Sequence, residues 1–222
     1  MTISDKNEDL LKSILESFDR IRHIDSADLP NIDLYMDQVT TFMDSRMKAT
    51  TRHPETDKIL TKTMINNYAK NDLLPPPVKK KYSREHMLVL IFIYYFKNVM
   101  SINDIQEILK PLTERYFDAD GELTLTDIYD EVFSLRDEEV ELLKSNVESN
   151  FAYSRTLFEE TEGEEKDFLQ HFAFITMLCV DVYAKKLLIE KLVDQIREGR
   201  ETGEESKTDQ KSDRKTNVKG DK

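Results

Sequence analysis

Apolar residues recur at helical spacing in most segments of this chain. The clearest set has the i, i+4, i+5, i+8 spacing of one helical face: Leu60, Met64, Ile65 and Tyr68. This set predicts a helix over 61–70 whose other side faces outward and carries polar residues: Lys62, Thr63, Asn66, Asn67 and Lys70. Three prolines at 75–77 then force the chain into an extended turn, because proline fixes φ and removes a backbone donor.

The same period predicts further helices at 8–24, 32–47, 84–99, 127–135, 137–154 and 164–197, and Ser101 stands where an N-cap would open another. Segment 84–99 is so apolar that we expect a helix buried on most sides rather than an aromatic platform for single-stranded nucleic acid. Segment 48–58 is polar and fits either a loop insertion or a short extra turn. Charged residues without an apolar face predict a disordered tail over 199–222.

The helix predicted at 164–197 has more apolar residues than one face of a surface helix needs: Phe168, Phe172, Ile175, Leu178, Val182, Leu188, Leu192 and Ile196. Two arrangements would use them. Either these side chains all turn inward and close a monomeric bundle, or the helix joins two copies of the chain.

Composition is typical of a helical protein of the cytoplasm. The 222 residues include five glycines and no tryptophan, and the single cysteine, Cys179, has no partner within the chain for a disulfide. No run of about 18 apolar residues predicts a membrane span. The N-terminus has neither the basic nor the apolar region of a secretory signal, so we expect a cytoplasmic location.

Recognisable catalytic and metal-binding motifs do not occur in the sequence. The four histidines are scattered, and neither a phosphate-binding glycine loop nor a nucleophile motif is present. An acidic stretch around Gly121 has the composition of a calcium loop, but aligning that glycine puts Tyr116 where the first carboxylate ligand belongs. We therefore expect no enzymatic activity, no cofactor and no metal, and instead a turn in which Thr124 or Thr126 caps the next helix.

Charge is distributed unevenly along the chain. The net charge is −12, which by itself argues against nucleic-acid binding. Yet the segment from Arg46 to His86 holds ten lysines and arginines against four acidic residues, a net +6, so the rest of the chain carries −18. A basic DNA-binding module, which we call the reader, attached to an acidic body would show this distribution. An ordinary basic loop in contact with solvent would show it as well.

The order of helix, stiff turn, basic loop, buried helix and capped helix suits a winged helix-turn-helix. At these residues the sequence resembles the MerR family of bacterial transcription regulators, through Met-Ile-Asn-Asn-Tyr-Ala at 64–69, Asp-Leu-Leu-Pro-Pro at 72–76, Lys-Lys-Tyr-Ser at 80–83 and Met-Ser-Ile-Asn-Asp-Ile at 100–105. The stretch Leu-Pro-Asn-Ile-Asp-Leu-Tyr-Met-Asp-Gln-Val-Thr-Thr-Phe-Met at 29–43, followed by such a winged module, is similar, more closely still, to the domain of unknown function 1836 family, and the resemblance covers about residues 29–151. The chain departs from the MerR pattern at Asn66, which replaces an arginine, and in a shorter wing.

The resemblance implies an all-α fold in which a MerR-like winged helix-turn-helix is followed by a C-terminal helical bundle. The expected parts are an N-terminal amphipathic helix at 1–28, the reader at 29–115, an acidic helical domain at 116–198 and the tail at 199–222. It further implies a regulator that binds double-stranded DNA through helix 61–70 and a basic wing at 78–82. The residues expected to contact DNA are Lys62, Thr63, Asn66, Asn67, Lys70, Lys79, Lys80, Lys81, Tyr82 and Arg84.

Two further expectations complete this interpretation. A single reader makes few base contacts, and MerR regulators pair two readers on a palindromic site, so the resemblance implies a homodimer, which we expect to form through helix 164–197. The alternative function is a protein-interaction scaffold that keeps the winged fold without binding DNA, which the overall acidity and Asn66 would fit. The sequence identifies neither an operator nor a small-molecule effector.

Overall fold

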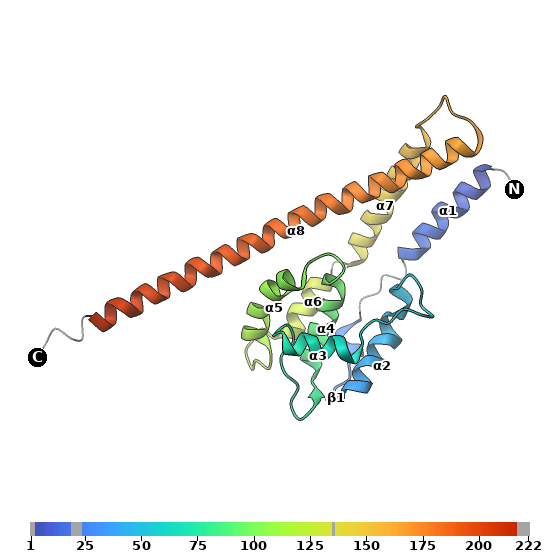
Figure 1. Ribbon diagram of the computed structural model, residues 1–222. Coiled ribbons are helices and arrows are strands. Elements are labelled where there is room, and N and C mark those ends of the chain that lie inside the picture. The colour runs from blue at the N-terminus through green and yellow to red at the C-terminus, as the bar shows by residue number, and fades with distance from the viewer. Residues whose placement is uncertain (1–2, 19–23, 135, 217–222) are drawn as a thin grey trace, which may run out of the picture.

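The structure, a computed structural model, describes residues 3–18, 24–134 and 136–216, and it is mainly helical, as predicted (Figure 1). In chain order the elements are α1 (Ile3–Phe18), the 3-10 turn η1 (Ser26–Asp28), β1 (Leu34–Tyr35), α2 (Met36–Met47), the 3-10 turn η2 (Lys48–Thr50), α3 (Lys62–Lys70), β2 (Lys81–Tyr82), α4 (Arg84–Phe96), α5 (Ile102–Tyr116), α6 (Leu125–Phe133), α7 (Arg136–Arg155) and α8 (Gly163–Thr216).

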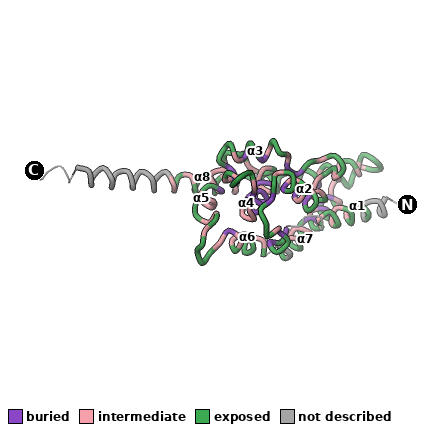
Figure 2. The backbone as a smooth tube through the Cα atoms, turned by 90° about the horizontal axis from the view of Figure 1, so that it is seen from below, coloured by how far each residue is buried: buried purple, intermediate pink, exposed green. Residues whose placement is uncertain are grey.

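Helix α4 is the centre of the main body, which spans residues 24–134. Its residues from His86 to Tyr94 are all buried, as the apolar sequence predicted, and buried positions gather around it in Figure 2. Helices α2, α3, α5 and α6 and the strand pair surround it and contribute to one continuous apolar core. Because the aromatic rings of α4 pack inside this core, they are not available to stack on nucleic-acid bases.

A second, smaller core lies where α1, α7 and the first part of α8 meet. Val147, Phe151 and Phe174 are buried there, and the rings of Phe151 and Phe174 meet edge to face at 5.3 Å. Apolar residues of α1 cover this cluster: Leu11, Ile14, Leu15 and Phe18. Figure 1 shows this bundle beside the main body, with α8 running from one to the other.

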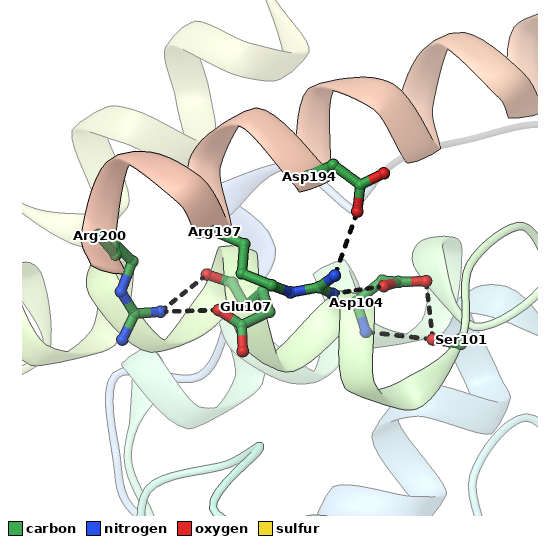
Figure 3. A network of polar contacts seen from close by, with 6 residues as sticks. All are labelled: Ser101, Asp104, Glu107, Asp194, Arg197 and Arg200. Carbon is green, nitrogen blue, oxygen red and sulfur yellow. Dashed lines mark hydrogen bonds and ion pairs between the residues drawn. The ribbon is translucent and has the colours of Figure 1, made fainter. Parts of the chain in front are cut away.

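Polar contacts fix the C-terminal part of α8 to α5. Arg197 donates to a carboxylate oxygen of Asp104 at 3.1 Å, and Arg200 pairs with Glu107 at 3.2 Å (Figure 3). Asp104 is also part of the α5 N-terminus, where the Ser101 hydroxyl accepts from its backbone N–H as predicted for this cap. Between these arginines and the bundle, Val193 of α8 is buried.

The structure corrects several predicted boundaries. Residues 32–35 are not helical, because Leu34 and Tyr35 form a strand that pairs with Lys81 and Tyr82 before α2 begins. Segment 48–58 contains a 3-10 turn followed by an irregular loop. The helix predicted at 8–24 corresponds to α1, which the structure describes from Ile3 to Phe18, while Ile21 lies outside the described residues and Ile24 belongs to the main core.

Two domain boundaries also differ from the expected ones. Helix α6 belongs to the main body and not to the acidic helical domain, because Leu125 and Tyr129 are buried in the main core. The predicted cap is confirmed there, since Thr124 and Asp127 form a capping box at its N-terminus. Helix α8 continues to Thr216, so the expected disordered tail is helical as far as that residue, and 217–222 lie outside the described part.

Candidate nucleic-acid interface

Helix α3 presents the polar face that its sequence predicts. The Thr61 hydroxyl caps its N-terminus by accepting from the Met64 backbone N–H at 3.2 Å. Ile65 and Tyr68 turn into the main core, and this fixes the rotation of the helix. The other side is exposed at all five predicted positions: Lys62, Thr63, Asn66, Asn67 and Lys70.

The turn after α3 holds the following loop close to the helix. Asp72 has a φ of 54°, and the backbone N–H of Leu73 donates to the carbonyl of Tyr68 at 2.9 Å. This 6→1 bond, with a left-handed residue just past the helix end, is a Schellman motif, in which glycine is the usual residue. Leu73 and Leu74 then enter the core, so the chain leaving α3 is anchored before the three prolines begin.

The basic wing is a tight turn between Val78 and Lys81. The Lys81 backbone N–H donates to the Val78 carbonyl at 2.9 Å, and the two residues between them, Lys79 and Lys80, have φ of 51° and 65°. Positive φ at both central positions is the pattern of a type I′ turn, where Asn-Gly is preferred. Both lysines are exposed at the tip, and β2 pairs with β1 at its base.

Two of the remaining predicted residues support the wing from below. The ammonium of Lys81 lies 5.3 Å from the centre of the Tyr35 ring, on the paired strand. Tyr82 is only 3% exposed, and its ring meets the edge of His86 at 5.4 Å. Tyr82 is therefore a core residue at the foot of the wing, and its ring does not reach the surface where a duplex would lie.

Arg84 has partners within the protein. Its guanidinium donates to Asn31 Oδ1 at 3.0 Å and to the backbone carbonyl of Ser26 at 2.8 Å. These bonds hold the loop before β1 onto the start of α4. We therefore place Arg84 among the residues that build the main body rather than with the exposed lysines.

One acidic side chain belongs to the same surface. The Asp37 carboxylate, in the first turn of α2, forms an ion pair with the Lys62 ammonium, and both side chains are largely exposed. An exposed pair of this kind contributes little to stability. It does lower the positive charge at the N-terminal end of the α3 face.

His86 connects the wing to the loop that follows α5. It is 2% exposed, its Nδ1 accepts from the Ser83 backbone N–H at 2.9 Å, and its ring meets Phe117 edge to face at 4.8 Å. Burial lowers the pKa of His86, because the low-polarity surroundings disfavour the charged imidazolium. The neutral ring thus forms part of the packing under the wing.

The loop between α3 and β2, which forms the wing, lies at the edge of the main body away from α8 in Figure 1. The most acidic part of the described chain is the far end of the bundle, around Glu159, Glu160, Glu164 and Glu165, where α7 meets α8. This acidic end of the bundle is distant from the wing in Figure 1, while the main body carries acidic residues of its own, among them Asp37 beside Lys62.

Sequence reasoning did not find the strand pair, the Tyr35–Lys81 contact or the Asp37–Lys62 ion pair. Strands of two residues have no periodicity to detect, and both contacts join residues far apart in the chain. The hydrogen-bond partners of Arg84, Asn31 and Ser26, could not be predicted for the same reason. Among the described residues, no cluster of three or more His, Cys, Asp or Glu side chains is arranged to hold a metal ion, and no described helix has the length and apolar character of a membrane span.

Comparison with known proteins relates the main body to a family. Residues 24–132 match the family model described as domain of unknown function (DUF1836), and these bounds follow the main body of the structure from its first described residue, Ile24, to α6. The main body is thus the part of the chain that the family model describes, whereas the bundle lies outside it. No curated protein and no solved structure matches the chain.

Proposed function

We propose that the domain of unknown function 1836 carried by residues 24–132 is, in this protein, a MerR-like winged reader of double-stranded DNA in a transcription regulator. The observation that carries the proposal is the combination of an exposed polar face on α3 with an exposed two-lysine wing tip in the loop that follows this helix. Each part alone is common on protein surfaces. Together they offer a helix for a groove and cations for the adjacent phosphates.

Helix α3 has dimensions and side chains suited to the major groove. Its nine residues extend about 13 Å at 1.5 Å per residue, and the groove of B-DNA is about 12 Å wide. Asn66 and Asn67 are exposed near the middle of the helix, and an asparagine amide can bond adenine through both its donor and its acceptor. Lys62 and Lys70 stand at the two ends, where the phosphate backbones would pass.

The wing would contribute affinity rather than sequence selection. Lys79 and Lys80 are exposed and have no carboxylate partner in the described structure, whereas Lys62 is paired with Asp37. When lysine ammonium groups neutralise phosphates, the cations condensed on the DNA are released. This release is the main source of affinity for duplex DNA of any sequence. Lys81 adds charge at the base of the wing, over Tyr35.

A protein-interaction scaffold is the second candidate function. The Asp37 carboxylate beside Lys62 and the asparagine at position 66 favour it, since both leave α3 less basic than a strong DNA reader would be. In that case the same exposed face would contact a protein. Binding to duplex DNA separates the two functions.

The test is fluorescence anisotropy on a pool of random duplexes at several salt concentrations. We expect binding that weakens with salt, and a slope of log affinity against log salt that falls by about two in the variant Lys79→Ala/Lys80→Ala, because each phosphate contact contributes about 0.9. The charge-matched control is Lys110→Ala/Lys144→Ala, on α5 and α7, which should leave the slope unchanged. If the wild-type protein does not bind duplex DNA, or if both variants lower the salt slope equally, the proposed DNA binding through the wing is wrong.

A further inference from the structure

A groove runs along the outer face of α2 in the main body. Asp37, Thr41 and Ser45 recur every four residues on this face, opposite the buried face of the helix. The groove has a volume of about 460 Å³, and it is completed by Gln38 and Phe42 on α2 and by Pro30 and Leu34, which come just before the helix. We call it the α2 groove.

Acceptor oxygens predominate among the polar groups of the α2 groove. The Thr41 hydroxyl donates to the Asp37 carbonyl at 2.8 Å, and the Ser45 hydroxyl donates to the Phe42 carbonyl at 2.7 Å. Both hydroxyl protons are thus used within α2, and these two groups retain only oxygen lone pairs for a ligand. A ligand that bonds them must therefore bring its own donors.

Asp37 is the charged residue that lines the α2 groove, and its side chain is 75% exposed. Lys62 pairs with its Oδ1 atom, whereas no residue in the described part of the chain bonds its Oδ2 atom. A guanidinium or ammonium group that approaches along the groove can bond Oδ2 while Lys62 keeps Oδ1. Such charge-assisted hydrogen bonds are roughly twice as strong as those between neutral groups. The charge of the groove thus favours a cation.

The remaining lining of the α2 groove is apolar. Leu34 and Phe42 pack on the main core on their inner side, and Pro30 lies beside them in the groove. Ile32, which lies in the chain between two of the lining residues, is 69% exposed. An apolar side chain placed against Leu34 and Phe42 would be removed from water there, so the groove favours a ligand with an apolar group as well as a cation.

The shape of the α2 groove favours a peptide over a small molecule. Small-molecule sites typically bury about 70–90% of the ligand surface. The α2 groove is instead open to solvent over the eight residues from Asp37 to Ser45, which is about 12 Å of helix, and its polar lining residues are exposed. A small ligand would stay largely in water. A peptide can extend beyond the groove and contact Ile32 as well.

We propose that the α2 groove binds a short segment of another protein in which an apolar side chain lies next to an arginine or lysine. The apolar side chain packs on Leu34 and Phe42, and the cation bonds Asp37 Oδ2. The inference does not depend on DNA binding, because the residues that line the groove belong neither to the exposed face of α3 nor to the wing tip.

The first experiment selects a phage-displayed library of random dodecapeptides on the full chain. We expect enriched peptides that share a large apolar residue adjacent to arginine or lysine, and that do not bind the variant Thr41→Trp, whose indole fills the groove. Thr41 is exposed, so this variant keeps the core intact, and circular dichroism during heating verifies its folding. If no peptide is enriched, or if the enriched peptides are acidic or bind Thr41→Trp as tightly as the wild type, the proposal is wrong.

The second experiment tests the contact with Asp37 by titration calorimetry on one selected peptide. We expect Asp37→Asn to weaken binding about tenfold, and changing the basic residue of the peptide to alanine to cause no further loss in that variant, because the two groups act as a pair. The matched control is Glu114→Gln, since Glu114 is exposed and paired with Lys110 as Asp37 is with Lys62. Asn66→Ala/Asn67→Ala should also bind normally, which separates this groove from the α3 face. Independent losses from the two changes, or an equal loss in Glu114→Gln, would overturn the proposed contact.

Discussion

Lys79 and Lys80 hold a backbone conformation that lysine disfavours. Both have positive φ, which costs a residue with a Cβ atom roughly 1–2 kcal/mol, and a type I′ turn is usually built from Asn-Gly. Strained residues of this kind cluster at functional sites. Two exposed lysines in this turn therefore suggest that their charge is retained despite a cost in stability.

We predict that Lys79→Asn/Lys80→Gly increases the free energy of unfolding by about 1–2 kcal/mol while lowering the salt slope of DNA binding by about two. Asparagine and glycine adopt positive φ at lower cost, and neither carries the charge. Urea denaturation and fluorescence anisotropy measure the two effects. The control is Lys79→Ala/Lys80→Ala, which removes the charge but keeps the strain, so it should lower the slope without any gain in stability.

Asn66 and Asn67 are expected to select sequence. We predict that either change to alanine weakens binding to a selected site by about 1–3 kcal/mol and leaves binding to random duplex nearly intact. Alanine is the best helix former, so loss of binding cannot be ascribed to unfolding of α3. Competition binding with specific and random duplexes measures the difference, with Asn103→Ala on α5 as the matched control. An equal loss on both duplexes would assign the asparagines to the backbone of the DNA.

At the scale of elements, α4 lies at the centre of the main core, and its first turn packs under the wing. Protonation of a buried residue in that turn should therefore change the stability of the main body. Burial lowers the pKa of His86, and the folded chain therefore keeps the imidazole neutral where the unfolded chain protonates it. Between the folded and unfolded pKa values the unfolded state binds more protons. Stability contributed by the neutral ring is present above the unfolded pKa of about 6.5 and is lost as the pH falls below it.

We predict that the free energy of unfolding decreases as the pH is lowered from 7 towards 5, by up to about 1.4 kcal/mol per pH unit, and that His86→Gln lacks this decrease. Urea denaturation at each pH measures it. His53→Gln is the control, because His53 is exposed in the loop before α3 and should preserve the wild-type pH dependence. A wild-type decrease that persists in His86→Gln would assign the titration to another group.

At the scale of the whole molecule, two separate cores predict two units of stability. The bundle core has far fewer buried apolar residues than the main core, so it should open at lower free energy. We predict faster amide hydrogen exchange in α7 than in α4. Phe151→Ala should widen this difference, since removing a buried phenylalanine costs about 3–5 kcal/mol and leaves the main core untouched. Loss of protection in α4 as well would show that the arginine contacts between α5 and α8 couple the two units.

Local patterns were sufficient for the helices and for the faces they expose. The polar side of α3, the buried character of α4 and the caps at Ser101 and Thr124 all depend on residues within a few positions of one another. Each backbone hydrogen bond of a helix joins residues four positions apart, so a short stretch of sequence determines where the helix starts and which face it buries. The similarity of the main body to the domain of unknown function 1836 family could be recognised for the same reason, from one contiguous stretch at 29–43.

Tertiary structure alone decided which residues meet. Tyr35 lies under Lys81, Asp37 beside Lys62 and Arg84 against Ser26, although each pair is separated by 25 or more positions in the chain. It also assigned α6 to the main core and left one side of α8 uncovered. Burial of an apolar stripe on a helix is favourable whichever element covers it, since the hydrophobic effect is non-directional. The stripe therefore does not identify the element against which it packs. Only the packing of the other elements determines which part of that stripe is covered within the chain and which part stays exposed.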